Sequence, residues 1–449
     1  MNLANPSSAF CALDQLKGSE SELEINSDIL SIQQCLDSAE KSWNDASFSH
    51  FPAFSGITSS ATLGLLIYAL CAGKNALFMS PGTPCPAQCG ALISDQGLPM
   101  QVDDASPNVF EQGEEHQPPR GLVFLSSGTL GPAKKIWHSN QRMAMSAQVV
   151  ANRLSIDADD RVLITVPLHH MYGLGAALLP AIMKGARIKV LVNANLLSIN
   201  DAMKNFKPTL VYSTPHLLRT YLRRRSQALE GCRAVVLAGD VTTENMAEQA
   251  SQIFGSVYNL YGSSELGVVA ISSVNRPQEL VALQGVTVDV LASEQQKNIL
   301  TVDHPYRAEL IDQGTGPQPL TTPWNTSDIA TVNQDNSFTI HGRADLSVNR
   351  AGKLLVLAEL EQQIAEWPGI DMAIAVVHQT DGSFGKKISV LITAREDTLN
   401  QAELRALAIQ NLPAFARPEY FKLVKQLPCL KSGKPDRIKI TEEYLYESV

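Results

Sequence analysis

Short apolar runs alternate with longer amphipathic stretches through the middle of the chain. The apolar, β-branched runs are predicted as buried strands at residues 162–166, 188–192, 209–213, 234–238 and 256–260. Helical patterns separate these runs at residues 198–205, 215–228 and 242–254, and the last of them begins with the capping sequence Thr-Thr-Glu. This alternation predicts βαβ units around a largely parallel sheet, with ligand-binding residues in the loops that follow the strands.

The pattern changes on both sides of this region. Residues 61–73 are predicted as an apolar helix and residues 75–79 as a strand. From residue 283 short strands and turns replace the helices, and then a smaller segment follows, with helices at 359–366 and 401–410 and strands at 373–377 and 388–393. We therefore expect an α/β fold. It has a large N-terminal domain, 1–344, with mostly parallel sheets and a β-rich part at 283–344, and a small α+β C-terminal domain, 345–449.

A loop rich in glycine and hydroxyl residues follows the apolar run at residues 121–125. Its sequence from residue 126 to 135 is Ser-Ser-Gly-Thr-Leu-Gly-Pro-Ala-Lys-Lys. Glycines let backbone N–H groups approach an anion, hydroxyls donate hydrogen bonds, and lysines add positive charge, so the composition favours phosphate binding. The alternative is a flexible Ser/Gly turn that binds nothing. A P-loop is excluded because its second glycine would fall at Ala133.

Three further loops carry unusual residues after predicted strands. They are Pro-Leu-His-His-Met-Tyr-Gly-Leu at 167–174, Gly-Asp at 239–240, and Tyr-Gly-Ser-Ser-Glu-Leu-Gly at 261–267. Parallel strands end at the same edge of a sheet, so we expect these loops and the phosphate loop to form one composite site. Adjacent histidines at the end of a strand should point apart, which argues against a metal ion shared by His169 and His170.

Composition and charge narrow the function classes. The chain has 449 residues, 44% apolar and 18% charged, as expected for a soluble globular protein with two or three domains. Its formal charge of −9 disfavours nonspecific nucleic-acid binding. The N-terminus lacks a secretory pattern, and the most apolar run, 61–73, is too short to span a membrane. The seven cysteines are dispersed along the chain, which indicates reduced thiols and a cytoplasmic location. A zinc site at Cys85 and Cys89 is not expected, because no second Cys/His pair with zinc-ligand spacing accompanies them.

Taken in order, these loops resemble the motifs of the acyl-adenylate-forming superfamily, which includes acyl- and aryl-CoA ligases, stand-alone adenylation enzymes and luciferases. The resemblance covers about residues 51 to 440. Residues 126–134 resemble TSGTTGxPK, 167–174 resemble PLxHxxGL, and 259–265 resemble NxYGxTE. Residues 324–328 and 342–345 resemble the TGD and GRxD pair, and 427–437 resemble LPxTxxGKxDR.

The resemblance implies that a carboxylate attacks the α-phosphate of ATP, that pyrophosphate leaves, and that a thiol then takes the acyl group from acyl-AMP. Lys434 would compensate the charge that builds up between carboxylate and phosphate, with Lys431 as the nearby competitor. Glu265 would bind Mg²⁺, although an acid at a helix N-terminus is also plausible. Ser264 would donate to the α-phosphate, and Tyr261 would stack on adenine or belong to the core.

The remaining implied roles concern ATP, the hinge and the acyl pocket. The implied ATP-binding residues are Ser126, Ser127, Gly128, Thr129, Gly131, Lys134, Gly239, Asp240, Tyr261, Gly262, Asp328 and Arg343. Asp328 and Arg343 would hold the ribose hydroxyls, with an ordinary surface ion pair as the alternative. Asp345 would be the hinge of a mobile C-terminal domain. The acyl pocket would be bordered by His170, Met171, Tyr172, Thr214, Ala238 and Gly267, whose small members leave room for a flat or extended acid.

The thiol acceptor and the substrate stay open. The acceptor is CoA or the phosphopantetheine of an acyl carrier protein, and it is expected to come from outside because the chain ends soon after Lys434. A stand-alone adenylation enzyme of specialised biosynthesis, a non-catalytic nucleotide-sensing relative and a luciferase-like oxygenase are the alternatives. This chain departs from the family pattern at Leu130, Ala133, Ser327 and Asn349.

Overall fold

The computed structural model divides the chain into two compact units. The first contains Met1–Thr287 and Asp303–Thr322, and the second Val288–Val302 and Pro323–Val449. The residues that the structure describes are 22–25, 28–45, 52–55, 57, 59–72, 74, 76–79, 91–93, 99–100, 121–126, 134–223, 228–240, 242–292, 298–350, 353–378, 387–394, 399–429 and 435–445. Across these residues, no helix has the length and apolar character needed to cross a bilayer. The predicted domain boundary at residue 344 stays a prediction.

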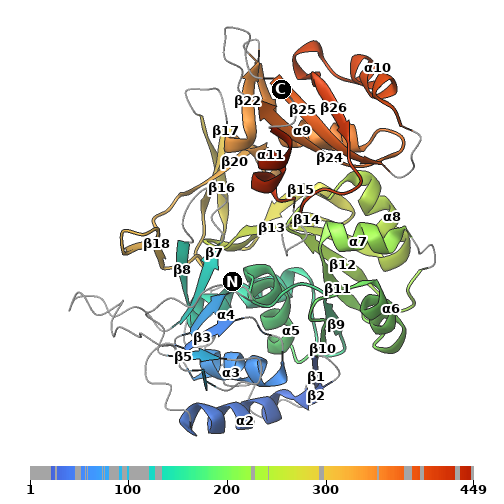
Figure 1. Ribbon diagram of the computed structural model, residues 1–449. Helices are drawn as coiled ribbons and strands as arrows, with labels where there is room; N and C mark the ends of the chain where they lie inside the picture. The colour runs from blue at the N-terminus through green and yellow to red at the C-terminus, as the bar shows by residue number, and fades with distance from the viewer. Residues whose placement is uncertain are drawn as a thin grey trace. The chain divides into compact units, whose positions relative to one another are not determined.

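The main sheet of the first unit runs in the order β15-β14-β13-β12-β11-β9-β10-β1-β2 (Figure 1). These strands are β1 (Glu22–Ile25), β2 (Asp28–Ser31), β9 (Arg161–Ile164), β10 (Arg187–Val190), β11 (Leu210–Ser213), β12 (Ala234–Ala238), β13 (Ser256–Ser263), β14 (Gly267–Ser273) and β15 (Arg276–Ala282). Strands β10, β9, β11, β12 and β13 are parallel, whereas β14 and β15 continue as an antiparallel meander. The predicted parallel sheet is therefore confirmed.

Helices cover this sheet on both faces, as alternating side chains of buried parallel strands require. Helices α6 (Leu196–Asn205), α7 (Pro215–Leu222) and α8 (Glu244–Phe254) share one apolar cluster with β9, β11 and β12. Helix α4 (Asn140–Arg153), the π-helix η1 (Tyr172–Leu178) and α5 (Leu179–Met183) pack together and contact the sheet through β9, β10 and β14. The predicted cap of α8 is confirmed, because Thr243 accepts from the Met246 N–H at 3.2 Å.

A second, eight-stranded sheet in the first unit has the order β19-β18-β8-β7-β4-β3-β5-β6. Its strands are β3 (Pro52–Ser55), β4 (Ala76–Met79), β5 (Ala91–Ile93), β6 (Pro99–Met100), β7 (Gly121–Ser126), β8 (Lys134–Ser139), β18 (Leu310–Asp312) and β19 (Pro317–Pro319). Helices α2 (Ile32–Asp45) and α3 (Ser60–Cys71) pack against each other.

The expectation that all four motif loops lie at one sheet edge is wrong. The phosphate-loop sequence joins the antiparallel strands β7 and β8 of the second sheet, while the other three loops follow strands of the main sheet. Local periodicity predicts a strand but not its partners, because pairing depends on residues far away in the chain.

The second unit contains a β-rich part and a small α+β part. The β-rich strands follow the order β16-β17-β20-β21 and are β16 (Thr287–Ala292), β17 (Asn298–Asp303), β20 (Trp324–Val332) and β21 (Ser337–Arg343). A 3₁₀ turn, η2 (Ala344–Leu346), leads to the hairpin of β22 (Ser347–Arg350) and β23 (Lys353–Val356). The α+β part contains α9 (Leu357–Ala365), β24 (Ile370–His378), β25 (Lys387–Ala394), α10 (Gln401–Asn411), η3 (Ala414–Ala416), β26 (Tyr420–Leu423) and α11 (Arg437–Leu445). The sheet β24-β25-β26 packs with α9 and α10 around one apolar core, whereas α11 contributes Ile440 to a second apolar cluster.

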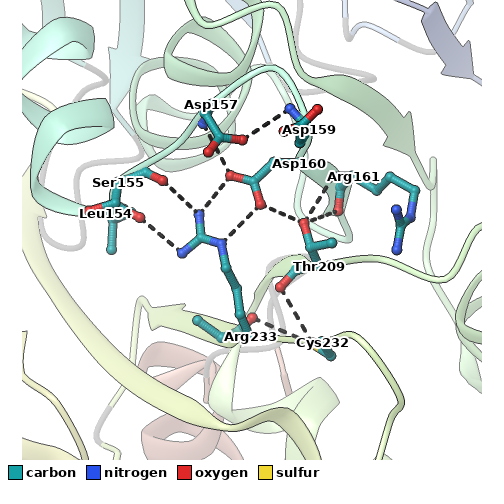
Figure 2. Close-up of polar contacts among 10 residues, drawn as sticks. Leu154, Ser155, Asp157, Asp159, Asp160, Arg161, Thr209, Cys232 and Arg233 are labelled. Carbon is teal, nitrogen blue, oxygen red and sulfur yellow. Dashed lines mark hydrogen bonds and ion pairs between the residues drawn. The ribbon is translucent and has the colours of Figure 1, made fainter.

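A polar network ties together the N-terminal ends of β9, β11 and β12 (Figure 2). Arg233 donates to both carboxylate oxygens of Asp160, at 2.9 and 2.7 Å, and to the Leu154 carbonyl at 3.0 Å. Thr209 donates to the same carboxylate at 2.6 Å and accepts from the Arg161 N–H at 2.9 Å. Ligands of parallel sheets bind at the other, C-terminal ends of the strands, so this network stabilises the fold and does not touch substrate.

We expect Arg233→Leu to lower the free energy of unfolding by about 2–3 kcal/mol, because Asp160, 5% exposed, loses its charged partner. Burial raises the pKa of Asp160, but hydrogen bonds from Arg233 and Thr209 lower that pKa by more. The contribution is therefore complete above the ordinary aspartate value of 3.8 and is lost as pH falls through the lowered pKa. Urea unfolding at pH 7 and pH 3 measures both effects.

The matched control is Arg276→Leu, which removes a guanidinium that pairs with Glu279 on the surface. We expect it to change the stability by less than about 0.5 kcal/mol. An equal loss in both variants would contradict a special role for the Asp160 network.

Candidate active site

Lys134 and Glu265 meet although they belong to different sheets. Lys134 is the first residue of β8, and Glu265 lies in the turn between β13 and β14. The Lys134 Nζ lies 3.7 Å from the Glu265 Oε1, with the side chains 35% and 15% exposed. A cation and a carboxylate thus face each other where the phosphate-loop sequence rejoins the second sheet. An ammonium group suits a phosphate and a carboxylate suits a metal ion, so this pair can hold a metal–nucleotide ligand.

The predicted loop at residues 261–267 is a hairpin. Strand β13 continues through Tyr261, Gly262 and Ser263, with a register shift between the first two, and β14 begins at Gly267. A Cβ at Gly262 would collide with the Gly267 carbonyl, and Gly267 has φ of +76°, which favours glycine. The alternative view of Glu265 as an acid at a helix N-terminus is wrong, because a turn and a strand follow it.

Two buried imidazoles hold the turn that carries Glu265. His138 of β8 donates from Nε2 to the Ser264 carbonyl at 2.7 Å, and His304 donates from Nε2 to the Val268 carbonyl at 2.9 Å. Burial lowers the pKa of each histidine to about 4, so both are neutral near pH 7. Neither histidine was predicted as a site residue from the sequence, because a single histidine in or beside an apolar strand carries no signal of its own.

The residues expected around the acyl pocket end or follow β9, β11 and β12, except Gly267, which begins β14, and they have different local roles. The single hydroxyl proton of Tyr172 is shared between the Ser213 and Val236 carbonyls, at 3.0 and 2.8 Å from the hydroxyl oxygen. Burial raises the pKa of Tyr172 well above its usual value. Thr214 caps α7 by accepting from the Leu217 N–H at 3.3 Å. Ala238 is buried at the end of β12, and Met171 is buried before η1. The pocket role of this set stays a prediction.

Two of the residues expected to bind ATP follow β12. Gly239, at φ +94°, and Asp240 are both exposed.

The expectation that adjacent histidines point apart is wrong. The ring centroids of His169 and His170 lie 4.3 Å apart with planes tilted by 52°. These residues lie in a turn ahead of η1 and not in an extended strand, so the alternation of strand side chains does not apply. Among the described residues no three His, Cys, Asp or Glu side chains are grouped to hold a metal ion.

Asp328 and Arg343 lie together in the second unit. They are register partners on β20 and β21, and Arg343 Nη1 lies 3.9 Å from Asp328 Oδ1. Ser327, which replaces the family's glycine, has φ of +62°, the left-handed conformation that glycine adopts most readily. The Ser327 N–H donates to the Asn325 side-chain oxygen, and the Asp328 N–H donates to the Thr326 hydroxyl. Neighbouring side chains therefore stabilise this turn.

Several predicted site residues lie outside the described residues. They are Ser127, Gly128, Thr129 and Gly131 of the phosphate loop, the departures Leu130 and Ala133, and both lysines Lys431 and Lys434. Ser126 ends β7 and Asp345 lies in η2, and both are described by their backbone. Their proposed roles stay predictions.

A histidine–glutamate pair joins β21 to α9 on either side of the predicted hinge. His341 Nδ1 lies 2.9 Å from Glu359 Oε1, and His341 Nε2 lies 2.8 Å from the Thr331 hydroxyl. The hydrogen bond with Glu359 raises the pKa of His341. The pair therefore adds stability below the ordinary histidine value of 6.5, and that stability is lost as pH rises through the raised pKa.

We expect Glu359→Gln to be less stable than wild type at pH 6 by less than about 1 kcal/mol, since both side chains are partly exposed. The two proteins should have equal stability at pH 9, where His341 is neutral in both. Urea unfolding at the two pH values measures the difference. Glu443→Gln, which removes the Glu443–Lys439 pair, is the control and should show no such pH dependence.

Comparison with known proteins identifies the family. A family model described as AMP-binding enzyme matches residues 83–312, more than half of the chain. This protein belongs to the AMP-binding enzyme family. The match includes the phosphate-loop sequence, Lys134 and Glu265, so the acyl-adenylate-forming resemblance is confirmed at the level of the family.

Individual relatives of this AMP-binding protein are distant in sequence. The 2-succinylbenzoate–CoA ligase of Staphylococcus aureus strain Newman is 24% identical over 330 residues, which cover 71% of this chain. The chain spans 66% of that ligase's length.

Solved structures of low identity share its fold. ATP-bound MatB from Rhodopseudomonas palustris has a TM-score of 0.81 at 16% identity, covering 97% of this chain and 98% of MatB. MenE from Bacillus subtilis, in complex with the acyl-adenylate OSB-AMP, has a TM-score of 0.78 at 16% identity, covering 96% and 97%. The anthranilate CoA ligase AuaEII, in complex with anthranoyl-AMP, has a TM-score of 0.81 at 16% identity, covering 99% of both chains. The predicted α/β fold class is therefore confirmed.

Proposed function

We propose that this protein activates a carboxylic acid with ATP to form acyl-AMP and pyrophosphate, and then transfers the acyl group to a thiol. The observation that carries the proposal is the approach of Lys134 and Glu265 to 3.7 Å within the part of the chain that matches the AMP-binding model. The first half-reaction needs charge neutralisation around phosphates, because a carboxylate anion must approach a polyanion.

The donor set around Glu265 suits Mg²⁺ held jointly with nucleotide phosphates. One partly buried carboxylate faces a lysine, and a hard cation that bridges phosphates needs only one or two protein carboxylates plus water. When bound, the ion would neutralise phosphate charge. Lys134 would contact the phosphates, Ser264 would donate to the α-phosphate, and Lys434 would approach the reacting oxygens.

The remaining site residues would orient the nucleotide and the acid. Tyr261 would offer its ring to adenine, beside Gly239, Asp240 and Gly262, while Asp328 and Arg343 would bind the ribose hydroxyls. In the proposal, Asp345 is the hinge of a mobile C-terminal domain. The pocket set named above would surround the acid.

An aromatic acid and CoA are the first substrates to test. The relatives include a 2-succinylbenzoate–CoA ligase and an anthranilate CoA ligase, whose names indicate aromatic acids and CoA. An acyl carrier protein is the second candidate acceptor, and fatty acids are the second class of acid. The proposal includes a cytoplasmic location, which the dispersed cysteines support.

The test is acid-dependent exchange of labelled pyrophosphate into ATP with a panel of aromatic and fatty acids. We expect exchange with at least one acid, AMP as the nucleotide product, and a thioester by mass spectrometry when CoA or a carrier protein is added. Release of ADP in place of AMP, or ATP binding without exchange for any acid, would contradict the proposal and favour the nucleotide-sensing alternative.

A further inference from the structure

The turn that carries Glu265 is held by hydrogen bonds from two separate segments. The Ser264 carbonyl accepts from His138 of β8, and the Glu265 carbonyl accepts from the Ala308 N–H at 2.8 Å. The Val268 carbonyl accepts from His304, four residues before Ala308. Neither segment is adjacent to the turn in sequence, so the fold brings two outside supports to a short stretch of backbone.

The His138 bond requires a proton on Nε2, because a carbonyl oxygen only accepts. Burial lowers the pKa of His138 to about 4, so near pH 7 the ring is the neutral Nε2–H tautomer. The side chain is 1% exposed, its ring packs edge-on against Phe124 at 5.8 Å between centroids, and its Nδ1 has no hydrogen-bond partner in the described part of the chain. A buried polar atom without a hydrogen-bond partner lowers the stability of the fold, and an apolar side chain would avoid this loss. The Nε2 hydrogen bond to the Ser264 carbonyl is what histidine offers here in return.

The same strand supports the turn at two points. Side chains two residues apart share a face of a strand, so one face of β8 carries Lys134, Ile136 and His138. On this face Lys134 approaches the Glu265 carboxylate, and His138 donates to the Ser264 carbonyl. The distance between the lysine and the carboxylate therefore depends on how firmly β8 holds the turn.

His304 supports the other end of the turn. It is fully buried, donates to Val268 at the start of β14, and accepts at Nδ1 from the Tyr306 N–H at 3.1 Å. Both ring nitrogens are used, so its orientation is fixed. A rigid backbone beneath a metal-binding carboxylate keeps that carboxylate in the geometry the metal requires.

We propose that His138 and His304 are positioning residues that hold the Ser264–Val268 backbone so that Glu265 and Lys134 are set to bind Mg·ATP. This inference rests on the proposed function. It assigns these residues no contact with substrate, so it predicts a loss of Mg·ATP affinity with little change in affinity for the acid.

The test compares His138→Asn and His138→Gln by calorimetric titration with Mg·ATP in the absence of any acid. The shorter asparagine amide does not reach the Ser264 carbonyl, whereas the glutamine amide nitrogen lies near the place of Nε2. We expect His138→Asn to raise the Kd for Mg·ATP about ten-fold and His138→Gln to stay within about three-fold of wild type. His304→Leu should behave like His138→Asn, and in steady-state assays KM for the acid should change little.

Asn140→Leu is the matched control. Asn140 is also 1% exposed, lies two residues from His138 and donates to the Leu70 carbonyl at 3.3 Å, away from Glu265. It should lower thermal stability without changing the Kd for Mg·ATP.

Unchanged affinity in His138→Asn, or an equal loss in Asn140→Leu, would overturn the inference while the proposed function stands. A wild-type protein that does not bind Mg·ATP would instead show that the proposed function itself is wrong.

Discussion

We expect Glu265→Gln to lower kcat/KM for Mg·ATP by about 100-fold, with little change in KM for the acid. Glutamine keeps the size of the side chain but lacks the charge that a hard cation requires, and it leaves Lys134 without its carboxylate partner at 3.7 Å. Steady-state assays of pyrophosphate release at varied Mg²⁺ and ATP measure the effect. Raising the Mg²⁺ concentration should recover part of the lost rate.

The control for this prediction is Glu309→Gln. Glu309 pairs with Arg142 at 3.4 Å in the same unit and is also partly buried, with its side chain 25% exposed against 15% for Glu265. Its replacement should leave kcat/KM within about three-fold of wild type. Equal losses in the two variants, or a Glu265→Gln enzyme with normal Mg²⁺ dependence, would contradict the role of Glu265 as the metal-binding carboxylate.

We expect Lys434→Ala to lower the rate of acid-dependent pyrophosphate exchange by about 100-fold to 1,000-fold, because the charge that forms between carboxylate and α-phosphate would lose its compensating cation. The second half-reaction, from synthetic acyl-AMP to the thioester, should keep nearly its full rate, since no phosphate–carboxylate repulsion arises there. Rapid-mixing assays of each half-reaction separate the two steps.

Lys431→Ala is the matched control, because it removes a lysine three positions away in the same segment. It should keep exchange close to the wild-type rate. The reverse result, with loss in Lys431→Ala and none in Lys434→Ala, would transfer the catalytic charge to Lys431.

Much of the local structure was predictable from the sequence. The runs at 209–213 and 234–238 became β11 and β12 within one residue, and Thr243 caps α8 as its type and position predict. Such features depend on contacts within a few residues, so they can be inferred locally. The strand at 256–260 was predicted too short, because β13 runs on to Ser263 through the register shift at Tyr261.

The composition of the candidate site was predictable in part. Glycine, hydroxyl and lysine residues predicted a phosphate loop, which stays a prediction, and the order of motifs indicated the family that the family model confirms. The backbone supports could not be found in this way. His138 and Ser264 lie 126 residues apart, and no sequence feature of either indicates the other.

By itself the sequence determined which residues carry charge, hydroxyl groups or conformational freedom, and in what order they follow buried strands. Only the tertiary structure decided that β7 and β8 join a different sheet from β13, and that Lys134 nevertheless meets Glu265. The physical reason is that strand pairing and side-chain approach depend on long-range packing, whereas periodicity and turn chemistry are properties of neighbouring residues.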